Sequence, residues 1–132
     1  MRLVLDTNVL FAAYIARGTC AVLYEQVLAT ETLVTSEPIL SEFEQALLVK
    51  ARVPHAEAAA ARRQVLGNAE VFHPVVLPAR VCRDADDDAI LGTAIAARAD
   101  LIVSGDKDLL VLRQYLGMPV ITPAKALARL QR

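Results

Sequence analysis

Aspartate is concentrated in one short region of this 132-residue chain. Seven of the eight aspartates lie between Asp84 and Asp108, and the eighth is Asp6. Four of them fall in the stretch RDADDDAIL (83–91), which leads into an alanine-rich apolar run. Two carboxylates about 5 Å apart repel by roughly 3 kcal/mol at an effective dielectric near 20, so a folded cluster of them favours a bound cation. Oxygen ligands without histidine or cysteine suit a hard ion, Mg²⁺ or Mn²⁺, which also bridges to phosphate.

The segments that must position these carboxylates alternate between short apolar runs and helical spacing. This alternation is typical of an α/β domain with a mostly parallel sheet. Strands are predicted at residues 2–5, 32–36, 71–77, 100–106 and 119–122. Helices are predicted at residues 7–16, 20–29, 39–52, 55–70, 87–99, 107–117 and 123–132. We therefore expect one domain over residues 1–132, with three α/β/α layers and a central, mostly parallel five-stranded sheet.

Several acids follow the predicted strands. Asp6 ends the first strand, Asp106 ends the fourth, and Glu42 lies in the helix after the second. In parallel α/β sheets, ligands bind beyond the carboxyl ends of the strands, near a switch in strand order. If the first and fourth strands are neighbours, these acids converge at one edge of the sheet.

Each acid also has a structural interpretation without a ligand. Asp86 or Asp87 can cap a helix and complement its dipole. Asp108 can be an N-cap or a site residue, and the sequence favours neither. Glu42 flanks Phe43 on the apolar stripe of its helix, which indicates a semi-buried position. Asp6 has the weakest alternative, because a carboxylate ending a buried strand costs free energy unless it is bound.

The overall composition limits the partners and the compartment. The net charge of −1 gives no general affinity for nucleic acids or membranes. Cys20 and Cys82 have no ligand-like spacing, which favours a reduced, cytoplasmic protein. The N-terminus does not read as a signal peptide, and no apolar run has the length of a membrane span. A hydrophobic content of 55% permits an apolar surface for a partner or a second copy.

Four segments in order resemble the PIN-domain nucleases, and together they cover essentially the whole chain. They are LVLDTNVL (3–10), SEFEQAL (41–47), RDADDDAIL (83–91) and LIVSGDKDLL (101–110). Within that family, the chain is most similar to the VapC-like toxins of bacterial and archaeal toxin–antitoxin pairs. The resemblance implies an endoribonuclease that cleaves single-stranded RNA with water activated by Mg²⁺ or Mn²⁺. It also implies a cognate antitoxin protein and a homodimer or higher oligomer.

The resemblance assigns roles to individual residues. It matches the family's catalytic acids to Asp6, Glu42, Asp88 and Asp106, with Asp6, Asp88 and Asp106 as metal ligands. It gives accessory roles to Asn8, Ser104 and Asp108, and treats Asp84, Asp86 and Asp87 as caps that deepen the negative potential. Because an acidic site repels RNA, basic residues must line its approach, and Arg83 and Lys107 are the candidates.

Three alternatives compete with this interpretation. A non-catalytic PIN-like module could bind RNA or protein, although all four acids are present. A PIN nuclease of RNA processing would share the same chemistry. A receiver-like phosphorylation domain also places acids at strand ends, but it needs paired acids after the first strand, where only Asp6 stands.

Overall fold

The computed structural model describes residues 1–131. Its strands are β1 (Arg2–Leu5), β2 (Thr32–Thr35), β3 (Ala69–Val71), β4 (Leu101–Val103), β5 (Gln114–Tyr115) and β6 (Met118–Ile121). Its helices are α1 (Thr7–Ile15), α2 (Thr19–Thr30), α3 (Glu37–Val49), α4 (His55–Asn68), α5 (Ala85–Ala97), α6 (Lys107–Leu110) and α7 (Pro123–Leu130). Among the described residues, no helix is long and apolar enough to cross a membrane.

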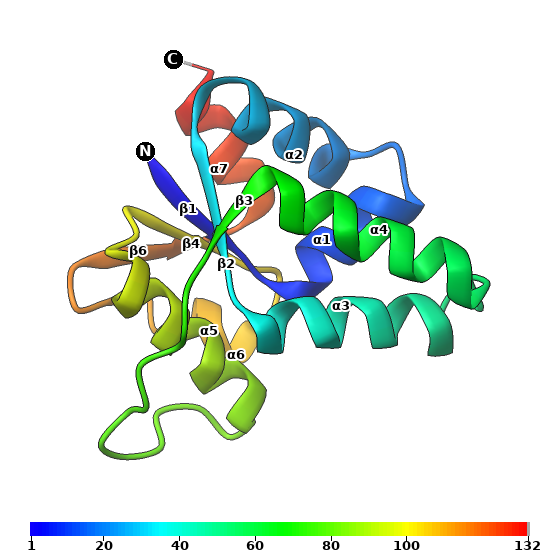
Figure 1. Cartoon of the computed structure of the whole chain (residues 1–132). Coiled ribbons are helices and arrows are strands. Elements are labelled where there is room, and N and C mark those ends of the chain that lie inside the picture. The colour runs from blue at the N-terminus through cyan, green and yellow to red at the C-terminus, as the bar shows by residue number, and fades with distance from the viewer. Residues whose placement is uncertain (132) are drawn as a thin grey trace.

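The strands form one sheet in the order β3-β2-β1-β4-β6-β5 (Figure 1). Every pairing is parallel except that of β5 with β6. The mostly parallel α/β fold is therefore confirmed. The expected number of five strands is wrong, because the short β5 adds a sixth at one edge. The third strand lies at the other edge, but it spans Ala69–Val71 instead of the predicted 71–77, and after Val71 the chain leaves the sheet.

Helices cover both faces of the sheet. Helix α5 contacts β1, β2 and β4, whereas α2 contacts β2 and α4 contacts β3. Because parallel crossovers are right-handed, the connections that run toward β3 and those that run toward β6 place their helices on opposite faces. The central strands are apolar and buried on both sides, with Leu3, Val4, Ile102 and Val103 at most 1% exposed.

The first and fourth strands are direct neighbours, as the argument from strand ends requires. Leu5 is paired with Val103, and the Asp6 N–H donates to the Val103 carbonyl oxygen at 2.9 Å. The chain leaves β1 toward β2 and leaves β4 toward β6, in opposite directions along the sheet. A crevice therefore opens beyond the carboxyl ends of β1 and β4.

The segment after β4 departs from the single helix predicted at residues 107–117. Helix α6 ends at Leu110, and the chain turns back through a tight hairpin between β5 and β6. Leu116 and Gly117 form its two-residue turn, with φ of 50° and 84°. Positive φ at both turn positions matches the right-handed twist of paired strands. Leucine seldom adopts that conformation, so the turn could not be predicted from its residue types.

Candidate metal centre

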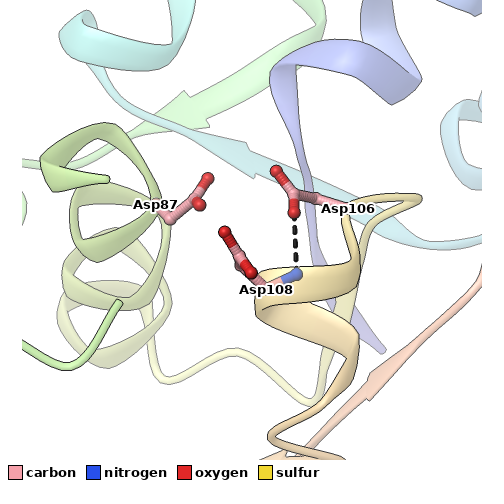
Figure 2. Close-up of side chains that lie close together, drawn as sticks. All are labelled: Asp87, Asp106 and Asp108. Carbon is pink, nitrogen blue, oxygen red and sulfur yellow. Dashed lines mark hydrogen bonds between the residues drawn. The ribbon is translucent and has the colours of Figure 1, made fainter. Parts of the chain in front are cut away.

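Three carboxylates meet beyond the carboxyl end of β4. Oxygen atoms of Asp87, Asp106 and Asp108 all lie within 4.8 Å of one another (Figure 2). Asp87 comes from the first turn of α5, whereas Asp106 and Asp108 stand at the start of α6. Helix α5 and the β4–α6 connection thus bring together acids that are distant in the sequence.

A chain of hydrogen bonds ties Asp6 to this triad. Ser104 Oγ donates to Asp6 Oδ2 at 2.7 Å and accepts from the Asp106 N–H at 2.9 Å. Ser104 is completely buried and Asp6 is 4% exposed. The Asp106 carboxylate in turn accepts from the Asp108 N–H at 2.8 Å, which caps α6. Ser104 therefore fixes two of the acids that the sequence places at strand ends.

The electrostatics of Asp6 and Asp87 reflect this crowding. Burial raises the pKa of Asp87 to about 7, and the charges of Asp106, Asp6, Asp84 and Asp108 act in the same direction. Burial also raises the pKa of Asp6; the Ser104 hydroxyl and nearby backbone N–H groups lower it in part. In both acids the neutral form is more favourable than in a solvated carboxyl, as expected for carboxylates forced together out of water.

Glu42 lies on the α3 side of the same site. Burial raises the pKa of Glu42 to about 7, and the charges of Asp86 and Asp6 contribute. The Thr7 hydroxyl opposes this shift without reaching hydrogen-bond geometry, and it is buried with no partner among the described residues. Glu42, Asp86 and Thr7 line one small cavity between α3 and α5. The structure therefore brings Glu42 toward Asp6, as the sequence predicts.

Asp88 lies elsewhere, and its expected place beside the other acids is wrong. Its two carboxylate oxygens accept from the backbone N–H groups of Val81, at 3.1 Å, and Cys82, at 2.7 Å. These contacts hold the loop that precedes α5. Residues one position apart on a helix project about 100° apart, so Asp87 and Asp88 cannot share one face. Asp87 occupies the place that the sequence analysis gave to Asp88.

The helix cap is also shifted from its expected position. Asp84 is the N-cap of α5, and its side chain accepts from the Asp86 N–H at 2.9 Å. The expectation that Asp87 acts as a cap is therefore wrong. Asp86 is exposed on the first turn, near Glu42. The four aspartates of residues 84–88 therefore have different positions. Asp84 caps the helix, Asp86 lies near Glu42, Asp87 belongs to the triad, and Asp88 binds the loop before α5.

The remaining predicted site residues lie around the rim. Asn8 is exposed and lines a groove with Glu42. Arg83 Nη2 lies 3.1 Å from Asp108 Oδ1. Lys107 is exposed at the first position of α6. Of these three side chains, only that of Arg83 makes an ion pair with the triad among the described residues.

The donor set of the triad fits a hard divalent cation. Three carboxylates offer oxygen ligands, and no histidine or cysteine belongs to the cluster. Asp87 is 8% exposed, so a charged carboxylate there needs a nearby positive charge. These properties suit Mg²⁺ or Mn²⁺ better than zinc or copper.

One signal in the sequence could have identified Asp87. The buried side of α5 is marked by Ile90, Leu91, Ala94 and Ala97. Counting back three positions from Ile90 and four from Leu91 reaches Asp87 both times, whereas Asp88 is reached only from Leu91 and lies to one side of this stripe. Helical periodicity therefore distinguishes two adjacent aspartates that composition treats as equal.

Comparison with known proteins places this geometry in a wider context. The family model described as "PIN domain" matches residues 2–108, which include all three acids of the triad. None of the curated proteins compared with the chain is significantly similar in sequence.

Two solved structures are similar in fold. One, PAE2754 from Pyrobaculum aerophilum, is 22% identical, with a TM-score of 0.69, and the match covers 99% of this chain and 90% of that one. The other is in the crystal structure of VapBC2 from Rickettsia felis bound to a DNA fragment from their promoter. It is 14% identical, with a TM-score of 0.64 and coverage of 92% of this chain and 98% of that one. At these identities the likeness concerns the fold.

Proposed function

Because this chain belongs to the PIN-domain family, we propose that it is a divalent-metal-dependent endoribonuclease that cleaves single-stranded RNA. The observation that carries the proposal is the triad of Asp87, Asp106 and Asp108 at the carboxyl end of β4. Family membership alone does not require a competent site, but three carboxylates held close together, one of them buried, favour a bound cation.

The proposed division of labour follows from the contacts of each side chain. Asp87, Asp106 and Asp108 hold Mg²⁺ or Mn²⁺, with Asp6 close behind them. When bound, the ion would lower the pKa of water and neutralise charge on the scissile phosphate. Ser104 orients Asp6 and the backbone of Asp106 through its two hydrogen bonds.

Glu42 is proposed as the general base, which accepts a proton from the attacking water. Its pKa of about 7 allows it to gain or lose a proton at neutral pH, as a general base must. Its position between α3 and α5 places it beside the acids and outside the triad itself. Asn8 lines the adjoining groove and can donate to a phosphate or to water.

RNA must approach an acidic site, so cations at the rim are part of the proposal. Arg83 and Lys107 lie beside Asp108 in space and in sequence, respectively. Phosphate contacts from such residues provide affinity that does not depend on base sequence.

We further infer that the protein is the toxin of a toxin–antitoxin pair and associates with an antitoxin and with a second copy of itself. The fold likeness to a member of VapBC2 supports this finer statement. Several large apolar side chains are exposed, among them Tyr14, Ile15, Val22 and Val76. Exposed apolar side chains of this size are available for contacts with another protein chain.

The proposal predicts that RNA cleavage stops in EDTA and returns with Mn²⁺. The test uses a 30-nucleotide single-stranded RNA that contains all four bases, and product lengths are measured by gel electrophoresis. Asp106→Asn should abolish cleavage, because a neutral amide is a poor ligand for a hard cation. Glu57→Gln, which removes a carboxylate from an exposed position on α4, is the charge-matched control and should cleave normally.

Two results would count against the proposal. Full cleavage in EDTA would exclude the metal, and RNA binding by the wild type without cleavage at any Mn²⁺ concentration would favour a non-catalytic binding module.

A further inference from the structure

We propose that Asp88 is a positioning residue, which holds the loop before α5 so that Arg83 stands beside the triad, ready to contact an RNA phosphate. The inference rests on the proposed function, since it concerns how that site meets its substrate. It concerns Asp88 and Arg83, neither of which belongs to the triad that is proposed to hold the metal.

The first observation is how completely Asp88 is engaged. Both of its carboxylate oxygens accept backbone N–H groups, from Val81 and Cys82, at 3.1 and 2.7 Å. Hydrogen bonds from N–H groups to a charged acceptor are among the stronger ones in proteins. Asp88 also lines a groove with Arg80 and the loop around Pro74, away from the triad. Both oxygens of its side chain are therefore hydrogen-bonded to the loop before α5.

The second observation is where that loop leads. Cys82, which Asp88 holds, is followed by Arg83, whose Nη2 lies 3.1 Å from Asp108 Oδ1. Arg80 Nη1 donates to the Arg83 carbonyl oxygen at 3.0 Å and stiffens the same turn. The Arg83 side chain is nonetheless 88% exposed. The loop thus places the solvated Arg83 guanidinium at the edge of the acidic triad. Hydrogen bonds hold the loop backbone, whereas the Arg83 side chain is largely exposed to solvent.

The chemistry of Arg83 indicates its partner. Guanidinium is a planar fork of five donors that matches the oxygens of a phosphate. Its single contact with Asp108 leaves most of these donors available. Once the charge of Asp108 is neutralised by a cation, the attraction that draws Arg83 inward weakens. The guanidinium can then turn to the phosphate of an arriving RNA while the loop stays in place.

Direct measurement of Mn²⁺ binding in the absence of RNA separates a positioning residue from a ligand. Asp88→Ala should bind Mn²⁺ within twofold of the wild-type Kd, measured by calorimetry. Asp87→Ala, the matched variant one position away, should lose Mn²⁺ binding. Far-UV circular dichroism confirms folding, and Asp88→Asn, which keeps one acceptor oxygen, replaces Asp88→Ala if that variant does not fold.

A double-mutant cycle tests whether Asp88 acts through Arg83. Binding of the 30-nucleotide RNA is measured with Ca²⁺ in place of Mn²⁺, over a range of salt concentrations. Arg83→Gln should weaken binding about tenfold, as for one hydrogen bond between charged groups. It should also reduce the salt slope by about 0.7, the value for one phosphate contact on a single strand.

The cycle is completed by Asp88→Ala, which should weaken RNA binding by no more than Arg83→Gln does. The double variant should be no weaker than Arg83→Gln alone, because both changes remove the same contact. Arg63→Gln, at an exposed position on α4, should leave the RNA affinity unchanged.

Three outcomes would overturn the inference. Loss of Mn²⁺ binding in folded Asp88→Ala would make Asp88 a ligand. Additive effects of Asp88→Ala and Arg83→Gln would make the two residues independent, and an unchanged salt slope in Arg83→Gln would remove the phosphate contact. If the wild type binds Mn²⁺ and RNA without cleaving the RNA, the proposed function is refuted. The binding measurements then still decide whether Asp88 is a positioning residue, because they do not require cleavage.

Discussion

At the scale of single residues, Asp87 is a buried carboxyl surrounded by other acids. It is 8% exposed and faces Asp106 and Asp108 within 4.8 Å. In the unfolded chain the same carboxyl is solvated and its pKa lies near 3.9. Folding therefore shifts its protonation, and this shift links the stability of the metal-free protein to pH.

The metal-free protein should lose stability as the pH rises. Because the pKa of Asp87 is raised to about 7, the folded state holds a proton that the unfolded state has released. The free energy of unfolding should fall between about pH 4 and pH 7, on the order of 1 kcal/mol per pH unit. Glu42, also raised to about 7, acts in the same direction. Thermal melts in EDTA from pH 4 to pH 8 measure the slope.

Asp87→Asn should flatten that slope and raise the Tm of the metal-free protein at pH 8, but not at pH 4, where the carboxyl is already neutral. Asp88→Asn is the adjacent comparison and should not raise the Tm, since it weakens contacts with Val81 and Cys82. The reverse pattern in the two variants would contradict the geometry of the triad.

The gathering of acids beyond the strand ends could be predicted from residue types, but the choice between Asp87 and Asp88 could not. Asp6 and Asp106 follow apolar runs, so their places at strand ends were readable from the sequence. Asp87 and Asp88 are identical neighbours, and only the side of the helix on which each lies distinguishes them. That side follows from the helical spacing of the apolar residues of α5, which residue type alone does not report.

At the scale of elements, α5 depends on one close backbone approach. The Val75 N–H donates to the Gly92 carbonyl oxygen at 3.0 Å. A Cβ at Gly92 would lie 2.3 Å from the Val75 carbonyl oxygen. Glycine at this position lets the segment after β3 pass directly against the helix that carries Asp87.

Gly92→Ala should therefore destabilise the protein, although alanine is the better helix former. Accommodating the new Cβ requires the backbone of the Val75 segment to move, and overpacking of this kind costs about 1–3 kcal/mol. Gly67 in α4 is the matched control, because a Cβ there meets nothing within 4 Å. Gly67→Ala should stabilise the protein by up to about 1 kcal/mol. Denaturant unfolding of both variants measures the difference, and equal effects would exclude the close approach.

Element types were easier to predict than the end of the chain. Apolar runs bounded by acids and prolines predicted β1, β2 and β6 to within one residue of their observed bounds, whereas the strand predicted at 100–106 is shortened to β4 (Leu101–Val103). Residues 107–117 have helical spacing, but α6 ends at Leu110, and Arg113 and Leu116, with φ of 59° and 50°, are not in a right-handed helical conformation. The pairing of β5 with β6 compensates for the unfavourable backbone conformation of these two residues. This pairing is a tertiary contact, so a local sequence pattern does not predict it.

At the scale of the whole molecule, metal binding and folding should be linked. The triad joins α5 to the start of α6, and Ser104 ties Asp6 to the same place. These groups meet only in the folded chain, so Mn²⁺ should stabilise the native state and not the unfolded one. At 100 times its Kd, Mn²⁺ should add about 2.7 kcal/mol to the free energy of unfolding.

For a domain of this size, that stabilisation should raise the Tm by roughly 10 °C, as measured by melts over a Mn²⁺ titration. Asp106→Asn should show almost no rise, and Glu57→Gln should match the wild type. A rise of equal size in Asp106→Asn would place the Mn²⁺ at another site.

The neighbouring positions of β1 and β4 set the time at which this site can exist during protein synthesis. Asp6 is added to the growing chain 98 positions before its partner Ser104. At about 5–20 residues per second, a ribosome needs roughly 5–20 s to cover that distance. Throughout that interval, the nascent chain has Asp6 but lacks β4, Asp106 and Asp108. A nascent chain therefore has no complete triad until α6 has left the ribosome, and under the proposed function it could not cut its own messenger RNA before that point.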